Sequence, residues 1–263
     1  GFLYLRCKDL SPTYVESLYE LGFVTLGAAS IYFIAILCLI SGIGCIMIYF
    51  IVFGDIAASL AVQTSGLGVE SILTKRLFYV MALALVMTPL CIKKHLKEMK
   101  LVSILLFCAI AIFVLVFIVQ LSVNGTAQNH DSNYIQYYDI ELNMKLITGF
   151  NIIVLAYAYQ VSLFPTYNSL GSNKSNETGI KAIMIGTSLS FLIYVTLGVL
   201  SIYIFGTALH PSVLTDVNQE VNVYSYIIRV TFLVVLACHI PYVFFPTKEC
   251  FLIIVDEARN QSM

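Results

Sequence analysis

The sequence predicts an all-α polytopic membrane protein, because of its composition and its long uncharged apolar runs. Of the 263 residues, 59% are hydrophobic and 11% are charged, and the mean hydropathy is +0.90. A soluble domain carries about 25% charged residues. No charged residue lies between Lys145 and Lys174, and one membrane span needs only roughly 20 apolar residues. Since barrel strands are shorter and alternate, such runs predict helices.

Six hydrophobic segments follow one another along the chain. They cover about residues 26–62, 77–92, 101–123, 146–165, 182–205 and 221–246. The first is long enough to require tilting in a bilayer, and the second ends near Pro89. The opening "GFLYLRC" is typical of the end of a span, and no signal peptide is visible. We therefore expect residues 1–263 to form one transmembrane domain that is part of a larger protein.

Basic residues are distributed unequally between the two predicted sides of the membrane. Ten lie on the side of "KKHLKEMK" (93–100) and three on the other. By the positive-inside rule the first side is cytoplasmic. The connections 63–75, 124–144 and 207–220 then face outward or into a lumen. The ten are Arg6, Lys8, Lys93, Lys94, Lys97, Lys100, Lys174, Lys181, Lys248 and Arg259, and the three are Lys75, Arg76 and Lys145.

Several classes of function lack support in the sequence. The net charge is −1 and no basic stripe is present, which argues against nucleic acid as a partner. "FGD" (53–55) and "YYD" (137–139) are superficially similar to presenilin-type protease motifs, but their order is reversed and Asp139 falls in a loop. Cys91 and His95 are too few for a metal site. Without zinc, nucleotide or serine-nucleophile motifs, we predict no enzyme, no metal and no cofactor.

Polar groups at membrane depth are the candidate functional residues. In "VLAYAYQVSLFPTYNSL" (154–170), Pro165 cannot donate a backbone hydrogen bond and frees the carbonyl of Val161. Interrupted helices occur in membranes only where they face protein or a watery cavity, and transporters place them at midplane sites. The alternative is that Pro165 ends the helix and the tyrosines lie at the inner interface.

The last segment repeats this pattern. Pro241 frees the carbonyl of Ala237, beside His239 and a little inward of the middle of the segment. His239 is either a functional group or a packing histidine that is hydrogen-bonded to another helix. Arg229 lies about two turns from the outer end, and we expect its side chain to snorkel outward.

Five stretches together resemble the amino acid/auxin permease family, and the match runs over essentially the whole chain. "GCIMIYFIVFGDI" (44–56) resembles the third helix of that family. "TPLCIKKHLKEMKLVS" (88–103) resembles its short fourth helix and basic turn. "AYAYQVSLFPTYNSL" (156–170) resembles the sixth-helix pattern, which ends in Phe-Pro-x-Tyr-Asn-x-Leu. "SLSFLIYVTLGVLSIYIFG" (188–206) and "IPYVFFPTKECF" (240–251) resemble helices seven and eight. The neutral amino acid transporter branch is the most similar in appearance.

The resemblance implies a partial LeuT-type fold, the five-plus-five inverted repeat of an eleven-helix transporter. This chain would cover the end of helix two through helix eight. The implied activity is secondary active transport of amino acids, with a neutral amino acid and the lipid bilayer as partners. The implied location is the plasma membrane or a vacuolar or lysosomal membrane.

The resemblance also implies a substrate site at Ala156, Tyr157, Tyr159 and Gln160. Backbone groups there would hold the carboxylate or amine, Tyr157 or Tyr159 would act as a gate, and Gln160 would tune side-chain choice. Members of the family often have Cys-His or Gly-His where this chain has Tyr159-Gln160, so the substrate does not carry over directly.

The residues before Pro241 indicate which ion is coupled to transport, if the resemblance holds. Sodium-coupled members tend to have hydroxyl residues where this chain has Ala237-Cys238-His239. We therefore expect H+ rather than Na+ as the coupling ion, with Ala237 and His239 at the coupling site. Two alternatives stay open. One is a transport-incompetent sensor or scaffold on the same fold, and the other is a channel, which would need charge rings that the sequence lacks.

Overall fold

A computed structural model describes most of the chain, and the regular structure of the described residues is helical. It covers residues 2–10, 17–65, 71–92, 100–125, 144–157, 160–168, 175–206, 210, 213–219 and 222–260. The helices in chain order are α1 (Phe2–Leu10), α2 (Leu18–Leu26), α3 (Ala29–Ser65), the 3-10 helix η1 (Ile72–Thr74), α4 (Arg76–Cys91), α5 (Lys100–Asn124), α6 (Met144–Ala156), α7 (Gln160–Asn168), α8 (Asn176–Phe205), α9 (Val213–Gln219) and α10 (Val223–Asn260).

Within the described ranges, four helices are long and apolar enough to cross a membrane. These spans are Ala29–Thr64, Leu101–Val123, Glu177–Phe205 and Val223–Arg259. Two further apolar helices, Arg76–Cys91 and Leu146–Ala156, are shorter. The 16 residues of α4 measure about 24 Å at 1.5 Å per residue, less than the roughly 30 Å hydrocarbon core. Large side chains such as Leu85 (74% exposed) and Phe150 (65% exposed) face outward, as expected for a surface in lipid.

Two of the predicted segment boundaries were wrong. The segment expected at 146–165 is divided, because α6 ends at Ala156 and α7 begins at Gln160. The last segment does not end near Pro246, since α10 continues through Pro241 and Pro246 to Asn260. Neighbouring helices stabilise a proline-containing helix in a membrane, and α10 packs against α3, α4, α5, α7 and α9.

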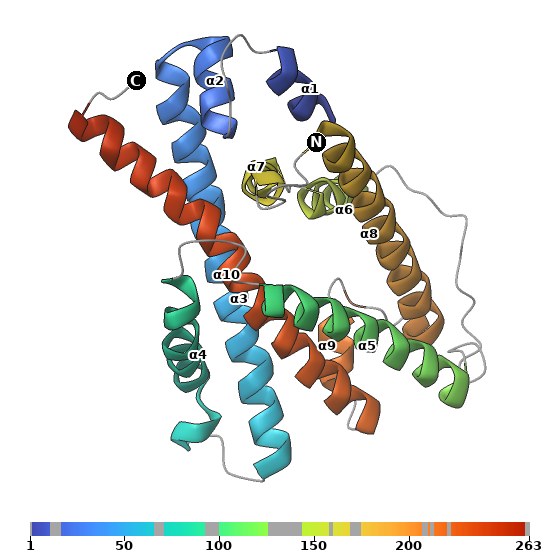
Figure 1. Cartoon of the computed structure of the whole chain (residues 1–263). Helices are drawn as coiled ribbons and strands as arrows, with labels where there is room; N and C mark the ends of the chain where they lie inside the picture. Colours follow the sequence, from blue (N-terminus) through green and yellow to red (C-terminus); the bar gives the residue numbers. More distant parts are fainter. Residues whose placement is uncertain are drawn as a thin grey trace.

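The centre of the molecule is the antiparallel pair of α3 and α10 (Figure 1). Near one end, a Cβ atom added at Gly42 would lie 1.9 Å from Oγ1 of Thr247, so this close approach requires glycine. Farther along, the rings of Tyr49 and His239 have centroids 5.8 Å apart. In an apolar stretch of 18 residues, 39% of the residues are buried in α10, compared with only 6% in α3 and in α8. We call this contact the α3–α10 interface.

Arg229 lies in the α3–α10 interface, and the expectation that it snorkels outward was wrong. Its side chain is fully buried. Nη1 donates to Oε1 of Gln63 on α3 (2.5 Å), and Nη2 donates to the backbone carbonyl of Val217 on α9 (2.8 Å). The hydroxyl of Ser225 donates to the same carbonyl (2.6 Å). Protein acceptors thus replace the water that snorkelling would reach, and they fasten α9 to α10 and α3.

α8 stands apart from the central pair, with α6 and α7 drawn between them (Figure 1). Its N-terminus is fixed by Ser175, whose hydroxyl accepts a hydrogen bond from the backbone N–H of Thr178 (3.1 Å). At the other end Gly206 adopts φ 58°, a left-handed conformation that glycine adopts without a steric penalty. Between these caps α8 contacts α5 and α1. Its first half faces α7.

Candidate functional site

The interruption between α6 and α7 is the first feature of the site. The backbone N–H of Tyr157 still donates to the carbonyl of Ile153 (3.3 Å), and α7 begins at Gln160. The interruption predicted from Pro165 was therefore misplaced, because α7 runs through Pro165 to Asn168. The first four N–H groups of a helix have no intrahelical partner. A proline at the sixth position removes only one further bond, to Val161, which a short helix can tolerate.

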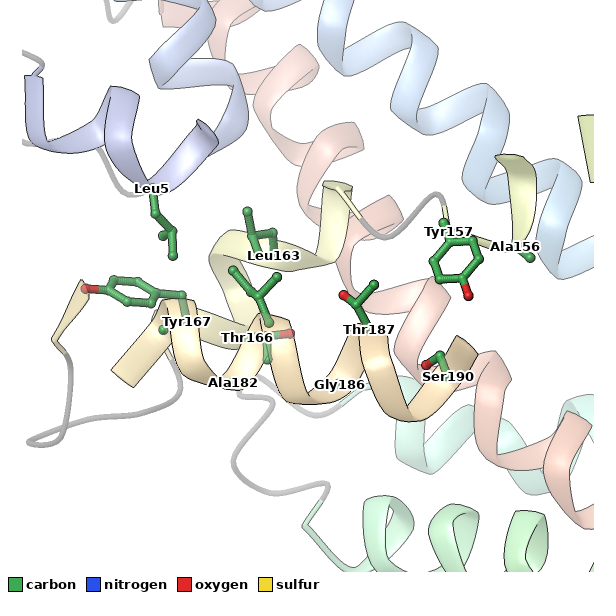
Figure 2. Close-up of a pocket in the computed structure, with 12 residues that line it drawn as sticks. Leu5, Ala156, Tyr157, Leu163, Thr166, Tyr167, Ala182, Gly186, Thr187 and Ser190 are labelled. Carbon is green, nitrogen blue, oxygen red and sulfur yellow. The ribbon is translucent and has the colours of Figure 1, made fainter. Parts of the chain in front are cut away.

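A cavity of about 350 Å³ lies beside this interruption, between α7 and α8 (Figure 2). The end of α6 contributes Ala156 and Tyr157, α7 contributes Leu163, Thr166 and Tyr167, and α1 contributes Leu5. The side of α8 that lines the cavity, here called the α8 wall, consists of Gly179, Ala182, Ile183, Gly186, Thr187 and Ser190. Ligand pockets in proteins typically measure about 300–1,000 Å³. The cavity is therefore large enough for a small molecule.

Aromatic residues mark the two ends of the cavity. At one end the ring of Tyr157 packs edge-on against Tyr194 of α8, with centroids 5.7 Å apart. At the other end, Tyr167 is buried and a Cβ atom at Gly179 would lie 2.8 Å from its ring. The ammonium group of Lys8 lies 4.3 Å from the centroid of the Tyr167 ring. Figure 2 shows Thr187 and Ser190 near Tyr157, and Leu5 near Tyr167.

The lining of the cavity is uncharged at the described positions. Hydroxyl groups come from Tyr157, Thr166, Tyr167, Thr187 and Ser190, and the other lining residues are apolar. An ionised side chain is costly to bury without a charged or hydrogen-bonding partner. This lining therefore suits a ligand whose side chain is uncharged.

The predicted substrate residues meet at this cavity only in part. Ala156 and Tyr157 line it. Tyr159 lies outside the described residues, and Gln160 begins α7 with its side chain likewise outside the described part. Sequence reasoning missed the α8 wall, although small residues at 179, 182, 186 and 190 share one helix face at spacings of three and four.

The predicted coupling residues lie elsewhere, on α10. Ala237 packs with the apolar cluster of Leu83, Met87 and Ile240, and neither Ala237 nor His239 is among the described lining residues of the cavity. His239 does bond within its own helix: Nδ1 lies 3.2 Å from the carbonyl oxygen of Val235. A carbonyl only accepts, so Nδ1 carries the proton and Nε2 is the nitrogen that can take up another.

The aspartate considered for protease chemistry has a structural partner. Oδ1 of Asp55 lies 3.2 Å from Nη1 of Arg76, which joins α3 to α4. Both side chains are about half exposed, and Asp139 lies outside the described residues. Asp55 is thus an ion-pairing residue in this structure.

Comparison with known proteins agrees with the family resemblance. The model of the family described as "Transmembrane amino acid transporter protein" matches residues 2–260. The chain belongs to this family of transport proteins, which are not enzymes, and it is an integral membrane protein with several spanning helices.

One relative is the Vacuolar amino acid transporter 7 of Saccharomyces cerevisiae. It is 32% identical over 136 residues, a match that covers 50% of this chain and 27% of the yeast protein. The match therefore spans much less than the length of that relative. No solved structure matches this chain.

Proposed function

We propose that this chain is the central part of a secondary transporter that carries neutral amino acids across a membrane. The observation that carries the proposal is the interrupted α6–α7 segment beside an uncharged cavity, in a chain that belongs to an amino acid transporter family. The partial LeuT-type fold belongs to the same proposal, and the vacuolar location in the yeast relative's name favours a vacuolar or lysosomal membrane over the plasma membrane.

The interruption supplies the polar groups that a zwitterion needs. The C-terminus of α6 leaves carbonyl groups without intrahelical partners, and the N-terminus of α7 leaves N–H groups. The helix dipoles favour an ammonium group at the first and a carboxylate at the second. In our proposal the backbone from Ala156 to Gln160 holds these two groups, Tyr157 or Tyr159 closes over them, and Gln160 tunes side-chain choice.

We further propose that transport is driven by, or sensitive to, protons, with His239 as the carrier or sensor. Histidine is the side chain whose ordinary pKa lies closest to neutral pH. In support, Nδ1 is bonded to Val235 and leaves Nε2 to bind the proton, and Tyr49 of α3 packs against the ring. The carbonyl of Ala237, to which Pro241 cannot donate the usual backbone hydrogen bond, adds an acceptor two residues from Val235 in the same helix.

Uptake by the full-length protein in proteoliposomes tests both proposals. We expect uptake of neutral amino acids, faster with an inward proton gradient and indifferent to sodium. Gln160→Ala should change the selectivity among neutral amino acids. Binding without flux for every amino acid would favour the sensor alternative and contradict transport.

A pair of histidine variants tests the role of His239. His239→Gln should flatten the pH profile of uptake. His210→Gln, in the connection between α8 and α10 where His210 pairs with Asp216, should keep it. An unaltered profile in His239→Gln, or uptake that requires sodium, would contradict proton coupling through this residue.

A further inference from the structure

We propose that the α8 wall sets the size of the substrate side chain, with Gly186 as the specificity-determining residue. The inference rests on the proposed function, because it assumes that the cavity receives the side chain of the transported amino acid. The substrate class that it names is neutral amino acids with aliphatic side chains.

The α8 wall is the largest single contribution to the cavity. It supplies six of the twelve described lining residues. Glycine, alanine and serine occupy the positions 179, 182, 186 and 190 of one helix face, so the volume of the cavity exists because these side chains are small. Larger residues at these positions would fill the cavity.

The two glycines of the wall are not equivalent. A Cβ atom at Gly179 would lie 2.8 Å and 2.9 Å from ring carbons of Tyr167 and 3.1 Å from Cδ1 of Leu5. A Cβ atom at Gly186 would meet nothing within 4 Å. The wall is therefore closed at Gly179 and open at Gly186, and a side chain added at Gly186 would enter the space of a ligand instead of displacing the protein.

The position of Gly186 relative to the interrupted helix fixes which part of the substrate it would meet. Tyr157 at the end of α6 lies at the Ser190 end of the cavity, whereas Leu163 and Thr166 of α7 face the middle of the wall. If the charged groups of the zwitterion stay at the interruption, the side chain extends past Thr187 along Gly186 toward Ala182. Its surroundings there are aliphatic, with Ile183 and Leu163 on either side of the cavity.

The same geometry predicts which side chains are excluded. Without a charged residue among the described lining residues, the side chain of lysine, arginine or glutamate would be buried without an ion partner. An aliphatic side chain needs no such partner, so it requires only enough space in the cavity. Each methylene that no longer fits changes specificity by roughly 10-fold or more.

A substitution series at Gly186 tests the inference in the full-length protein. Gly186→Ala, Gly186→Leu and Gly186→Phe are expected to reduce uptake of leucine progressively relative to that of alanine, with a change in the ratio of about 10-fold or more for Gly186→Phe. The matched control is the same series at Gly198, a glycine of α8 that also has nothing within 4 Å of an added Cβ atom and does not line the cavity. Its leucine-to-alanine ratio should stay within about 2-fold of the unsubstituted protein, since this range corresponds to less than about 0.5 kcal/mol.

Thiol protection provides a second measurement that does not depend on tolerance of a large residue. Leucine should slow the reaction of Gly186→Cys with a small thiol reagent, whereas arginine should not, and Gly198→Cys should react at the same rate with either. An unchanged leucine-to-alanine ratio in Gly186→Phe at normal abundance, or no protection by leucine, would overturn the inference while leaving transport intact. Absence of amino acid uptake by the unsubstituted protein would instead overturn the proposed function itself, and the inference with it.

Discussion

The α3–α10 interface and the α8 wall contrast in how glycine is used. At Gly42 the glycine lets two helices approach so closely that a methyl group would overlap Thr247. At Gly186 the glycine leaves open space beside a cavity. The first region also carries a buried arginine with partners on two other helices. Close packing and buried polar bonds stabilise the α3–α10 side, whereas the α8 side leaves room for a ligand.

The largest effect should follow from removal of the buried arginine. Arg229→Met eliminates hydrogen bonds to Gln63 and to the carbonyl of Val217, and bonds to charged groups contribute about 1.5–3 kcal/mol each. We expect a loss of about 3 kcal/mol in the free energy of unfolding, measured by thermal or denaturant unfolding in detergent.

An arginine outside the interface provides the control for this prediction. Arg76→Met removes a half-exposed ion pair with Asp55 and should cost less than about 1 kcal/mol. Equal losses for the two variants would show that the α3–α10 interface is no more important for stability than the surface pair between α3 and α4.

A smaller effect should follow from the same glycine substitution made in both regions. Gly42→Ala overpacks the α3–α10 interface and should destabilise by about 1–3 kcal/mol. Gly44→Ala on the same helix and Gly186→Ala on α8 meet nothing within 4 Å. These two should be neutral, or stabilising by up to about 1 kcal/mol through helix propensity.

A double variant sharpens this comparison. Adding Thr247→Ala to Gly42→Ala removes the Oγ1 and Cγ2 atoms, which lie 1.9 Å and 3.0 Å from the new Cβ atom, so part of the lost stability should return. Unfolding transitions of the single and double variants give the coupling between the two positions. Additive losses would mean that the cost of Gly42→Ala arises elsewhere.

The smallest effect should come from a single polar contact between α5 and α10. The hydroxyl groups of Ser103 and Tyr242 are hydrogen-bonded, and such interhelical bonds in membranes average about 0.6 kcal/mol. Ser103→Ala should lower stability by about this amount. Ser122→Ala, which removes a bond only to the carbonyl of Ile118 in α5 itself, is the matched control. If Ser103→Ala lowered the free energy of unfolding by more than about 2 kcal/mol, the contact between α5 and α10 would be as important for stability as the α3–α10 interface.

Much of the fold was predictable because membrane helices are encoded locally. Apolar runs of about 20 residues must form helices in lipid, since only helices satisfy their own backbone groups there. α3, α5 and α8 therefore occur close to where the apolar runs predict them. The C-terminal end of α10 was harder to predict, because Pro246 is a local stop signal that contacts with neighbouring helices override.

The candidate site was predictable from the sequence along one segment of the chain only. Residues 154–170 stand out in the sequence because polar groups at membrane depth are rare, and the structure places Ala156 and Tyr157 of this stretch in the lining of the cavity. Gly186, Thr187 and Ser190 carry no such signal, since small and hydroxyl residues are also ordinary packing residues in membrane helices. Their place in the lining of the cavity appears only when α8 is placed opposite α7.

By itself the sequence determined that the surroundings are a lipid bilayer, where most of the long helices lie, and that the segment 146–165 is interrupted, because each depends on hydrophobicity or backbone chemistry within a short window. The tertiary structure decided three other matters: that Arg229 is buried between Gln63 and Val217, that Pro165 lies within α7, and that the first half of α8 closes the cavity. These depend on which helices meet across large separations in sequence. The local sequence is the same whether a polar side chain bonds to another helix or extends to the water at the membrane surface. Only the packing of the helices decides between these two arrangements.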